Sequence, residues 1–310
     1  MYILKRILTM LLTIWVIITL TFIIMKCIPG DPFASDGDKL PPEVLANIRA
    51  QYNLDKPVPV QYLLYLKNLA TFNLGPSIQS KSRTVNEIIA SGFPASATLG
   101  VIALLVALVF GIFLGVVAAL NHRKLLDYFS MFVAIVGISI PSFILAPLLI
   151  EFFAVKWELL PVASWGTWQH TVLPAASLAV GPLAIIARFM RSSMLDVMNQ
   201  NYIKTADAKG LSTATIVLKH GIRNAILPVI SFIGPLFAAL ITGTFVIEKI
   251  FAIPGLGKYF VDSIFNRDYP VILGTTVFYS TILIVVLFII DISYRLVDPR
   301  ITLTSKGDQA

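Results

Sequence analysis

The sequence predicts an all-α protein that crosses a membrane six times. Of its 310 residues, 57% are hydrophobic and only 13% are charged, and the mean hydropathy is +0.83. A soluble domain of this size carries a far more charged surface. Long uncharged runs recur along the chain, and a helix of about 20 apolar residues crosses a bilayer. Lipid offers no hydrogen bonds to a bare backbone, so these runs must be helical.

The six predicted spans are not equally clear. The second and sixth are the clearest, whereas the fourth is short and contains Pro174, Gly181 and Pro182. Such residues are tolerated in membrane helices when neighbours satisfy the backbone groups that they free. We expect the chain, residues 1–310, to form a single transmembrane domain with spans at 7–25, 97–120, 130–150, 171–187, 229–247 and 271–290.

The first span is predicted to stay uncleaved. Lys5 and Arg6 precede an apolar run that is longer than a usual signal-peptide core, and no small-x-small cleavage site follows it. Lys26 before Cys27 argues against a lipoprotein signal. Because Cys27 is the only cysteine, we expect neither an internal disulfide nor a cysteine metal cluster.

The distribution of basic residues predicts that both termini are cytoplasmic. Of the 24 lysines and arginines, thirteen fall on the side of the termini and four in the two short loops opposite. An excess of such residues marks the cytoplasmic side. The net charge of +7 is therefore no sign of nucleic-acid binding. This orientation places the long segment 26–96 outside the cell and the loop 188–228 in the cytoplasm.

The extracellular segment is predicted to contain two short amphipathic helices at the membrane surface. Pro42 and Glu43 place a proline and an acid in the first turn of one helix. Tyr62, Leu66 and Leu69 recur at helical spacing in the other. Both helices are too short to indicate a separate enzyme domain.

The cytoplasmic loop contains the stretch "YIKTADAKGLS", which predicts a structured helix–glycine–helix unit. Residues 202–209 form a short helix that ends at Gly210 in the C′ position, and Ser212 caps a second helix over 213–225. Tyr202, Ala206 and Gly210 share a face through their spacing of four. That face is small and flat, so we expect another protein to approach it closely.

The spans contain no Asp, Glu, Lys, Arg or His. Ion-coupled transporters usually place an ionisable group at membrane depth, so energy for uphill transport is expected from another subunit. The stretch "GLGK" at 255–258 lacks the spaced first glycine and the Ser/Thr of a phosphate loop. His122, His170 and His220 lie in three different loops, and no HExxH or GxSxG occurs, which disfavours an enzyme.

Hydroxyl side chains are the polar groups inside the spans. They either line a hydrated, weakly selective path or bond to the backbone of their own or a neighbouring helix. Thr276 and Ser280 share a helix face. The candidate path residues are Ser231, Thr242, Thr276, Tyr279 and Ser280.

Several motifs together resemble the permeases of ABC importers, in the oligopeptide/dipeptide/nickel subclass. The loop stretch "YIKTADAKGLS…LKHGIRNAILP" is similar to the cytoplasmic coupling loop of that family. The resemblance covers nearly the whole chain and is nearest to the B-type subunit of oligopeptide importers. It is carried further by "PGDPF" at 29–33, "YNLDKPVPVQY" at 52–62, "RSSMLDV" at 191–197, "TFVIEKIFAIPGLG" at 244–257, "NRDYPVI" at 266–272 and "DPR" at 298–300.

This resemblance implies a non-catalytic subunit in the bacterial plasma membrane that forms half of the translocation path for oligopeptides. Two different permeases, two cytoplasmic ATPases that bind ATP and Mg, and an extracellular peptide-binding protein would form the complex. No cofactor is expected in this chain. The coupling helix that docks on an ATPase would comprise Tyr202, Ile203, Lys204, Thr205, Ala206, Asp207, Ala208, Lys209 and Gly210, with Leu211 and Ser212 next.

The chain departs from the broad family at one point. The broad coupling motif begins Glu-Ala-Ala, with a glycine six positions after the acid, whereas Lys204 stands at that position here. Asp207 is a candidate for the role of the acid. Alternatives that remain open are a dipeptide or nickel-chelate importer and, from a different class, a stand-alone secondary transporter.

Overall fold

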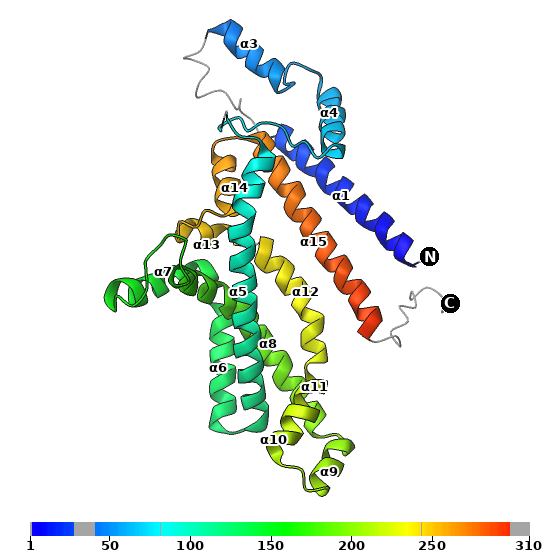
Figure 1. Cartoon of the computed structure of the whole chain (residues 1–310), viewed down its shortest axis with the longest axis vertical. Coiled ribbons are helices and arrows are strands. Elements are labelled where there is room, and N and C mark those ends of the chain that lie inside the picture. The colour runs from blue at the N-terminus through cyan, green and yellow to red at the C-terminus, as the bar shows by residue number, and fades with distance from the viewer. Residues whose placement is uncertain (1, 28–40, 81, 243, 298–310) are drawn as a thin grey trace. The chain divides into compact units, whose positions relative to one another are not determined.

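The computed structural model describes residues 2–27, 41–80, 82–242 and 244–297, and these residues are almost entirely helical (Figure 1). Four helices within them are long and apolar enough to cross a membrane: α1 (Tyr2–Cys27), α5 (Val85–Leu120), α8 (Gln169–Met198) and α15 (Tyr269–Val297). Two bent helix pairs raise the number of spans to six if each pair is one span. The predicted all-α membrane class is confirmed. The motifs at 29–33 and 298–300 lie outside the described residues.

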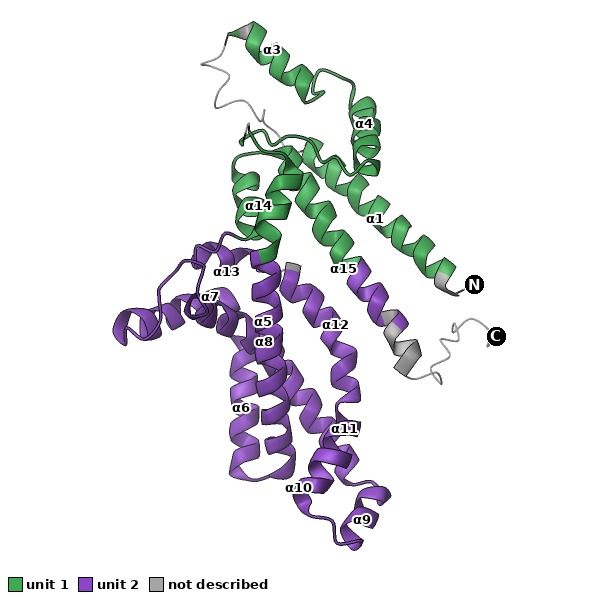
Figure 2. Cartoon of the chain, in the orientation of Figure 1, with its two compact units in different colours: residues 1–94, 255–284 green, residues 95–254, 285–310 purple. Residues whose placement is uncertain are grey.

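The chain forms two compact units (Figure 2). Unit 1 comprises residues 1–94 and 255–284, and unit 2 comprises residues 95–254 and 285–310. Helices α5 and α15 each contribute one part to each unit.

Helix α1 has the character of a lipid-facing span. Leu8, Leu11, Leu12 and Trp15 are all at least half exposed, and only 11% of its apolar window is buried. A helix that exposes apolar side chains this widely is stable only where lipid or another protein covers it. The predicted span 7–25 lies inside this helix.

Unit 1 contains the two helices predicted for the segment 26–96, α3 (Pro42–Gln51) and α4 (Val58–Ala70). Helix α5 begins well before residue 97, where its span was predicted to start. A capping box explains the early start: the Thr84 N–H donates to Glu87 Oε2 at 2.9 Å, and the Glu87 N–H donates to Thr84 Oγ1 at 3.2 Å.

The remaining parts of unit 1 are α14 (Leu256–Phe265) and the start of α15. Asp268, which is 2% exposed, joins this region to residues 77–79. Its carboxylate accepts hydrogen bonds from the Ser77 hydroxyl and from the N–H groups of Ile78 at 3.2 Å, Gln79 at 3.1 Å and Val271 at 3.4 Å.

In unit 2, the prediction of one span over 130–150 is wrong in its geometry. The structure has α6 (Leu125–Ser139), then α7 (Ser142–Leu149) continued by a π-helical segment η1 (Ile150–Lys156), with a bend of 105° between the two parts. The break falls at Pro141. The residue before a proline is pushed out of the helical region, and Ile140 has an extended backbone with ψ 115°.

The fourth and fifth predicted spans also change their bounds. Helix α8 extends beyond 171–187 and continues past Arg188, with Pro174 and Pro182 inside it. The span predicted over 229–247 is divided between α12 (Leu227–Thr242) and α13 (Phe245–Ile250). Thr244 lies between the two helices, and threonine has a weak helix propensity.

Small residues let the helices of unit 2 approach closely. A Cβ added to Gly115 of α5 would lie 2.6 Å from the Ala187 carbonyl oxygen of α8, and one added to Gly137 of α6 would lie 2.8 Å from Val180. Close backbone approach at glycine is the usual way for membrane helices to pack. Helix α8 is therefore the centre of this unit, and it carries the loop 188–228.

Candidate functional site

The loop 188–228 folds into a chain of short helices at one end of unit 2 (Figure 1). After α8 come α9 (Asn201–Ala208), α10 (Thr213–Thr215), a π-helical segment η2 (Ile216–Gly221) and α11 (Ile222–Ala225). The predicted helix–glycine–helix order is present, although the second helix is interrupted by the π segment. The pair Thr213–Ala225 and Leu227–Ile241 is bent by 52°.

Gly210 ends α9 as predicted. Its φ is +77°, in the left-handed region where glycine carries no steric cost. The Gly210 N–H donates to the Asp207 carbonyl at 2.8 Å, and the Leu211 N–H donates to the Ala206 carbonyl at 3.3 Å. These two bonds form a Schellman motif, which satisfies the last carbonyls of the helix. Ser212 then caps the next helix, because its Oγ accepts the Thr215 N–H at 3.3 Å.

Of the three residues of the predicted small face, Ala206 is buried, whereas Tyr202 and Gly210 are exposed. Ala206 is 8% exposed and packs in a buried cluster with Ile203 and Ile216, against Val197 and Met198 of α8. Ala206 itself is therefore covered by this chain, and the docking of another protein on the rest of the face stays a prediction. The small side chain of Ala206 lets α9 fold back onto η2 and the end of α8.

The opposite side of α9 is exposed and mostly polar. Tyr202 is 43% exposed, and Leu211 is 39% exposed just after the helix. The other exposed members of the predicted coupling set are Lys204, Thr205, Asp207, Ala208, Lys209, Gly210 and Ser212. Two basic side chains beside two exposed apolar ones give this side the mixed character of a transient protein interface.

Helix α8 holds the loop by close packing and by an ion pair. Met194 is fully buried, and a Cβ added to Gly221 of η2 would lie 2.5 Å from the Met194 methyl group, so a larger residue there would displace the Met194 side chain. One turn further back, Arg191 pairs with Asp127 at the start of α6. The exposed α9 helix is thus built on a rigid base.

The hydroxyl residues predicted to line a path belong to two helices, α12 and α15. The Ser231 hydroxyl donates to the Leu227 carbonyl of its own helix at 3.2 Å. Thr276, Tyr279 and Ser280 lie on α15, where Tyr279 is buried and the other two are half-buried. The side chain of Thr242 lies outside the described residues. The lining of a path remains a prediction.

Two features of unit 2 were not predicted from the sequence. A cavity of about 290 Å³ lies where the α6–α7 break meets α8 and α12, and Ser142 and Ser177 contribute to its lining. Glu248, which the sequence placed at the edge of a span, is fully buried on α13 and accepts the Thr244 hydroxyl at 2.5 Å. The short Thr-x-x-x-Glu spacing was the available signal for this contact.

The described residues contain no group of three or more His, Cys, Asp or Glu side chains that could hold a metal ion. Fold and site together define a polytopic helical membrane protein with a rigidly mounted, exposed helical loop. Such a surface is suited to a protein partner.

The comparisons with known proteins identify the family. Residues 111–303 match the model of the binding-protein-dependent transport system inner membrane component, and residues 1–100 match the N-terminal model of such membrane components. The chain belongs to this family. It is therefore a non-catalytic permease subunit of an ATP-driven ABC importer, and a multi-pass protein of the bacterial plasma membrane.

Relatives of similar length support this assignment. The chain is 55% identical to the dipeptide transport system permease protein DppB of Bacillus subtilis over 306 residues, which is 99% of each chain. It is 45% identical to the oligopeptide permease OppB of Haemophilus influenzae and 42% identical to that of Escherichia coli, each over 302 residues, 97% of this chain and 98% of the relative. The predicted peptide-permease subclass is confirmed.

Two solved transporters share the fold. An inward-facing methionine ABC transporter, MetNI, matches with a TM-score of 0.56 and 18% identity, over 68% of this chain and 96% of that chain. A second, described as an amino acid ABC transporter with histidines, matches with a TM-score of 0.53 and 15% identity, over 68% of this chain and 94% of that chain.

Proposed function

We propose that this chain is one of two permease subunits in an importer of peptides. Its loop 188–228 would bind an ATPase subunit, and the conformational change that ATP drives in that subunit would move the loop. One observation carries the coupling role: α9 presents an exposed side while its other side packs on η2 and α8. A force applied to such a helix is transmitted to α8 rather than lost in a flexible loop.

The partners follow from the family. A second permease, two ATPases that bind ATP and Mg, and an extracellular binding protein complete the proposed complex, with both termini of this chain cytoplasmic. The whole chain, 1–310, acts as one permease domain because α5 and α15 each run through both compact units. Ser231, Thr242, Thr276, Tyr279 and Ser280 remain the proposed path residues.

Peptides are the proposed substrates because the relatives are named for dipeptides and oligopeptides. The sequence motifs favour oligopeptides as the substrate, whereas the relative with 55% identity is a dipeptide permease, so both peptide classes should be tested. Labelled dipeptide, pentapeptide and nickel-chelate uptake should be compared in cells that carry or lack the gene. Loss of nickel uptake alone would refute the peptide assignment.

The coupling role is tested by charge reversal on the exposed side of α9. Lys204→Glu combined with Lys209→Glu should abolish uptake while the chain still inserts and folds, because both side chains are exposed. Lys67→Glu on α4 is the matched control, since Lys67 is also exposed but lies far along the sequence from the loop. Full uptake by the double variant would show that α9 is not the contact.

A further inference from the structure

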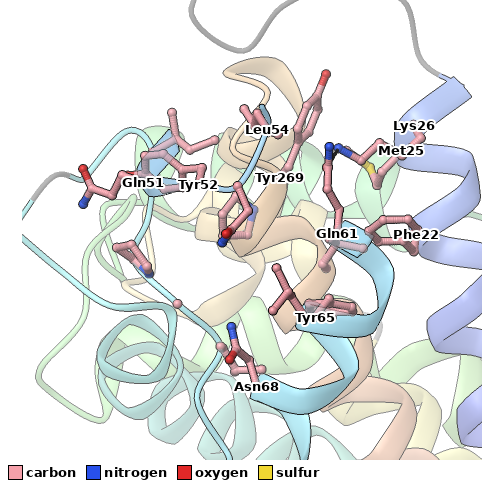
Figure 3. A pocket seen from close by; sticks show the side chains of 18 residues that line it. Phe22, Met25, Lys26, Gln51, Tyr52, Leu54, Gln61, Tyr65, Asn68 and Tyr269 are labelled. Atoms are coloured by element: carbon pink, nitrogen blue, oxygen red, sulfur yellow. Dashed lines mark hydrogen bonds between the residues drawn. The ribbon is translucent and has the colours of Figure 1, made fainter. Parts of the chain in front are cut away.

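A pocket of about 170 Å³ lies in unit 1, where the end of α1, the turn after α3, helix α4 and the start of α15 meet (Figure 3). None of its lining residues belongs to the coupling loop or to the proposed path. Its volume is close to that of an engineered apolar cavity of about 150 Å³ that takes up benzene. The pocket therefore has room for one ring-sized apolar group.

Aromatic side chains form one wall of the pocket. The rings of Phe22 and Tyr65 lie stacked, with centroids 6.1 Å apart and an interplanar angle of 22°. Met25 and Leu273 are buried beside Phe22 in the same cluster. This wall is rigid and apolar, because it joins α1, α4 and α15 in one packed group.

A positive charge lies at the same wall. The Lys26 ammonium donates to Gln61 Oε1 at 2.5 Å and lies 5.7 Å from the centre of the Phe22 ring. Figure 3 shows Lys26 and Gln61 meeting on the side of the pocket next to Phe22. In the part of the chain that the structure describes, no ion pair includes Lys26. An ammonium without a counter-ion attracts an anion.

A second donor belongs to Tyr65 of α4, which is one of the residues that line the pocket. The Tyr65 hydroxyl is buried and has no hydrogen-bond partner among the described residues. Burial raises the pKa of Tyr65, so the phenol stays protonated and keeps its donor. A buried polar group without a partner is rare in native structures and calls for an explanation. A ligand that brings an acceptor to the Tyr65 hydroxyl would supply one.

We propose that this pocket binds a small apolar anion, in which one ring-sized apolar group is next to a carboxylate or a phosphate. The apolar group packs against Phe22, the anionic group accepts from Lys26, and an acceptor atom satisfies the Tyr65 hydroxyl. Two sources offer this chemistry, namely a free carboxylate with an aromatic side chain and the head region of an anionic lipid. The site does not depend on which substrate the importer carries.

The test uses the full chain in phosphatidylcholine nanodiscs and fluorine NMR of two probes. N-acetyl-4-fluorophenylalanine carries the ring and the carboxylate, and its amide lacks only the charge. The acid should bind saturably, and the amide about tenfold more weakly, because charge-assisted hydrogen bonds are roughly twice as strong as neutral ones. Lys26→Gln should weaken the acid about tenfold, and the matched control Lys67→Gln should not change its affinity.

Tyr65→Phe keeps the ring and removes only the hydroxyl, so it should weaken binding several-fold without loss of folding. The acid probe is then titrated in phosphatidylglycerol nanodiscs. If it no longer binds there, the natural occupant is a bilayer lipid; if it binds equally well, the occupant is a solute. The proposal is overturned if neither probe binds saturably in phosphatidylcholine, if acid and amide bind equally, or if Lys26→Gln binds like the wild type.

Discussion

Arg191 of α8 forms a bidentate ion pair with Asp127 of α6, in which Nε lies 2.6 Å from Oδ1 and Nη2 lies 2.7 Å from Oδ2. The Asp127 side chain is only 3% exposed, and its Oδ2 also accepts the N–H of Arg123 at 3.0 Å. The pair therefore joins the turn between α5 and α6 to the helix that carries the loop 188–228. If the proposed coupling role is right, a displacement of that loop would act on α5, α6 and α8 together.

Breaking this pair from one side should be costly. Arg191→Leu leaves the buried Asp127 carboxylate with only the Arg123 N–H and His122 beside it, which costs up to about 3–5 kcal/mol of unfolding free energy. Asp127→Asn should cost less, because the Arg191 side chain is 25% exposed and keeps part of its hydration. Denaturant unfolding of the purified chain in detergent measures the loss. Glu151→Gln is the control, because the Glu151–Lys156 pair is about half exposed and such pairs contribute about 0–1 kcal/mol.

The double variant Asp127→Asn with Arg191→Leu separates the contribution of the pair from that of its surroundings. Removal of both charges leaves no uncompensated group, so the double variant should be more stable than either single one. If the double variant loses as much unfolding free energy as the two single variants added together, the interaction between the two side chains contributes little to stability.

The turn at Gly210 should tolerate substitution in an order set by backbone strain alone. A Cβ at this position meets nothing within 4 Å, so only the φ of +77° opposes a side chain. Alanine should destabilise the turn by about 1–2 kcal/mol, and asparagine by less, because asparagine adopts this conformation more readily. Hydrogen exchange of the α9 amides should rise in the order Gly, Asn, Ala. Equal exchange in all three would contradict the role of the Schellman motif.

Ala206 and Lys209 should distinguish folding of the loop from docking. Ala206→Arg forces a charge into the cluster with Ile203 and Ile216, so both hydrogen-exchange protection of α9 and uptake should fall. Lys209→Glu changes only an exposed side chain. It should lower uptake while α9 keeps its protection. If Lys209→Glu also unfolds α9, its effect on uptake says nothing about a partner.

The sequence predicted the elements whose signals are local. Gly210 and Ser212 are turn and cap residues with strong preferences of their own, and both are located where the pattern placed them. The start of α5 was missed although its capping box is readable as Thr84-x-x-Glu87. The span was placed from its long uncharged apolar run, 97–120, and the capping box before that run was not considered.

Other features depended on contacts far apart in the chain. Ala206 appeared to belong to an outward face because spacing shows which residues share a face but not where that face points. Its burial against Met198 and Ile216 depends on tertiary packing, which the local sequence does not show. The pair of Asp127 with Arg191 joins residues on two helices, and no local pattern predicts which of many basic residues the acid selects.

Asp268 offers the sharpest test of how the segment before α5 is held. Its buried carboxylate accepts from the Ser77 hydroxyl and from the N–H groups of Ile78, Gln79 and Val271. Asparagine keeps the shape, but its amide replaces one acceptor oxygen with a donor that faces other donors. Because hydrogen bonds to charged groups contribute about 1.5–3 kcal/mol each, Asp268→Asn should open this region before the rest of the chain unfolds.

Limited proteolysis of this variant should then cut near residues 77–79 at least tenfold faster than in the wild type. Asp55→Asn is the control, because Asp55 is exposed and its variant should be cut at the wild-type rate. Unchanged cleavage in Asp268→Asn would mean that packing around Val85 and Leu273, rather than the carboxylate, fixes these residues.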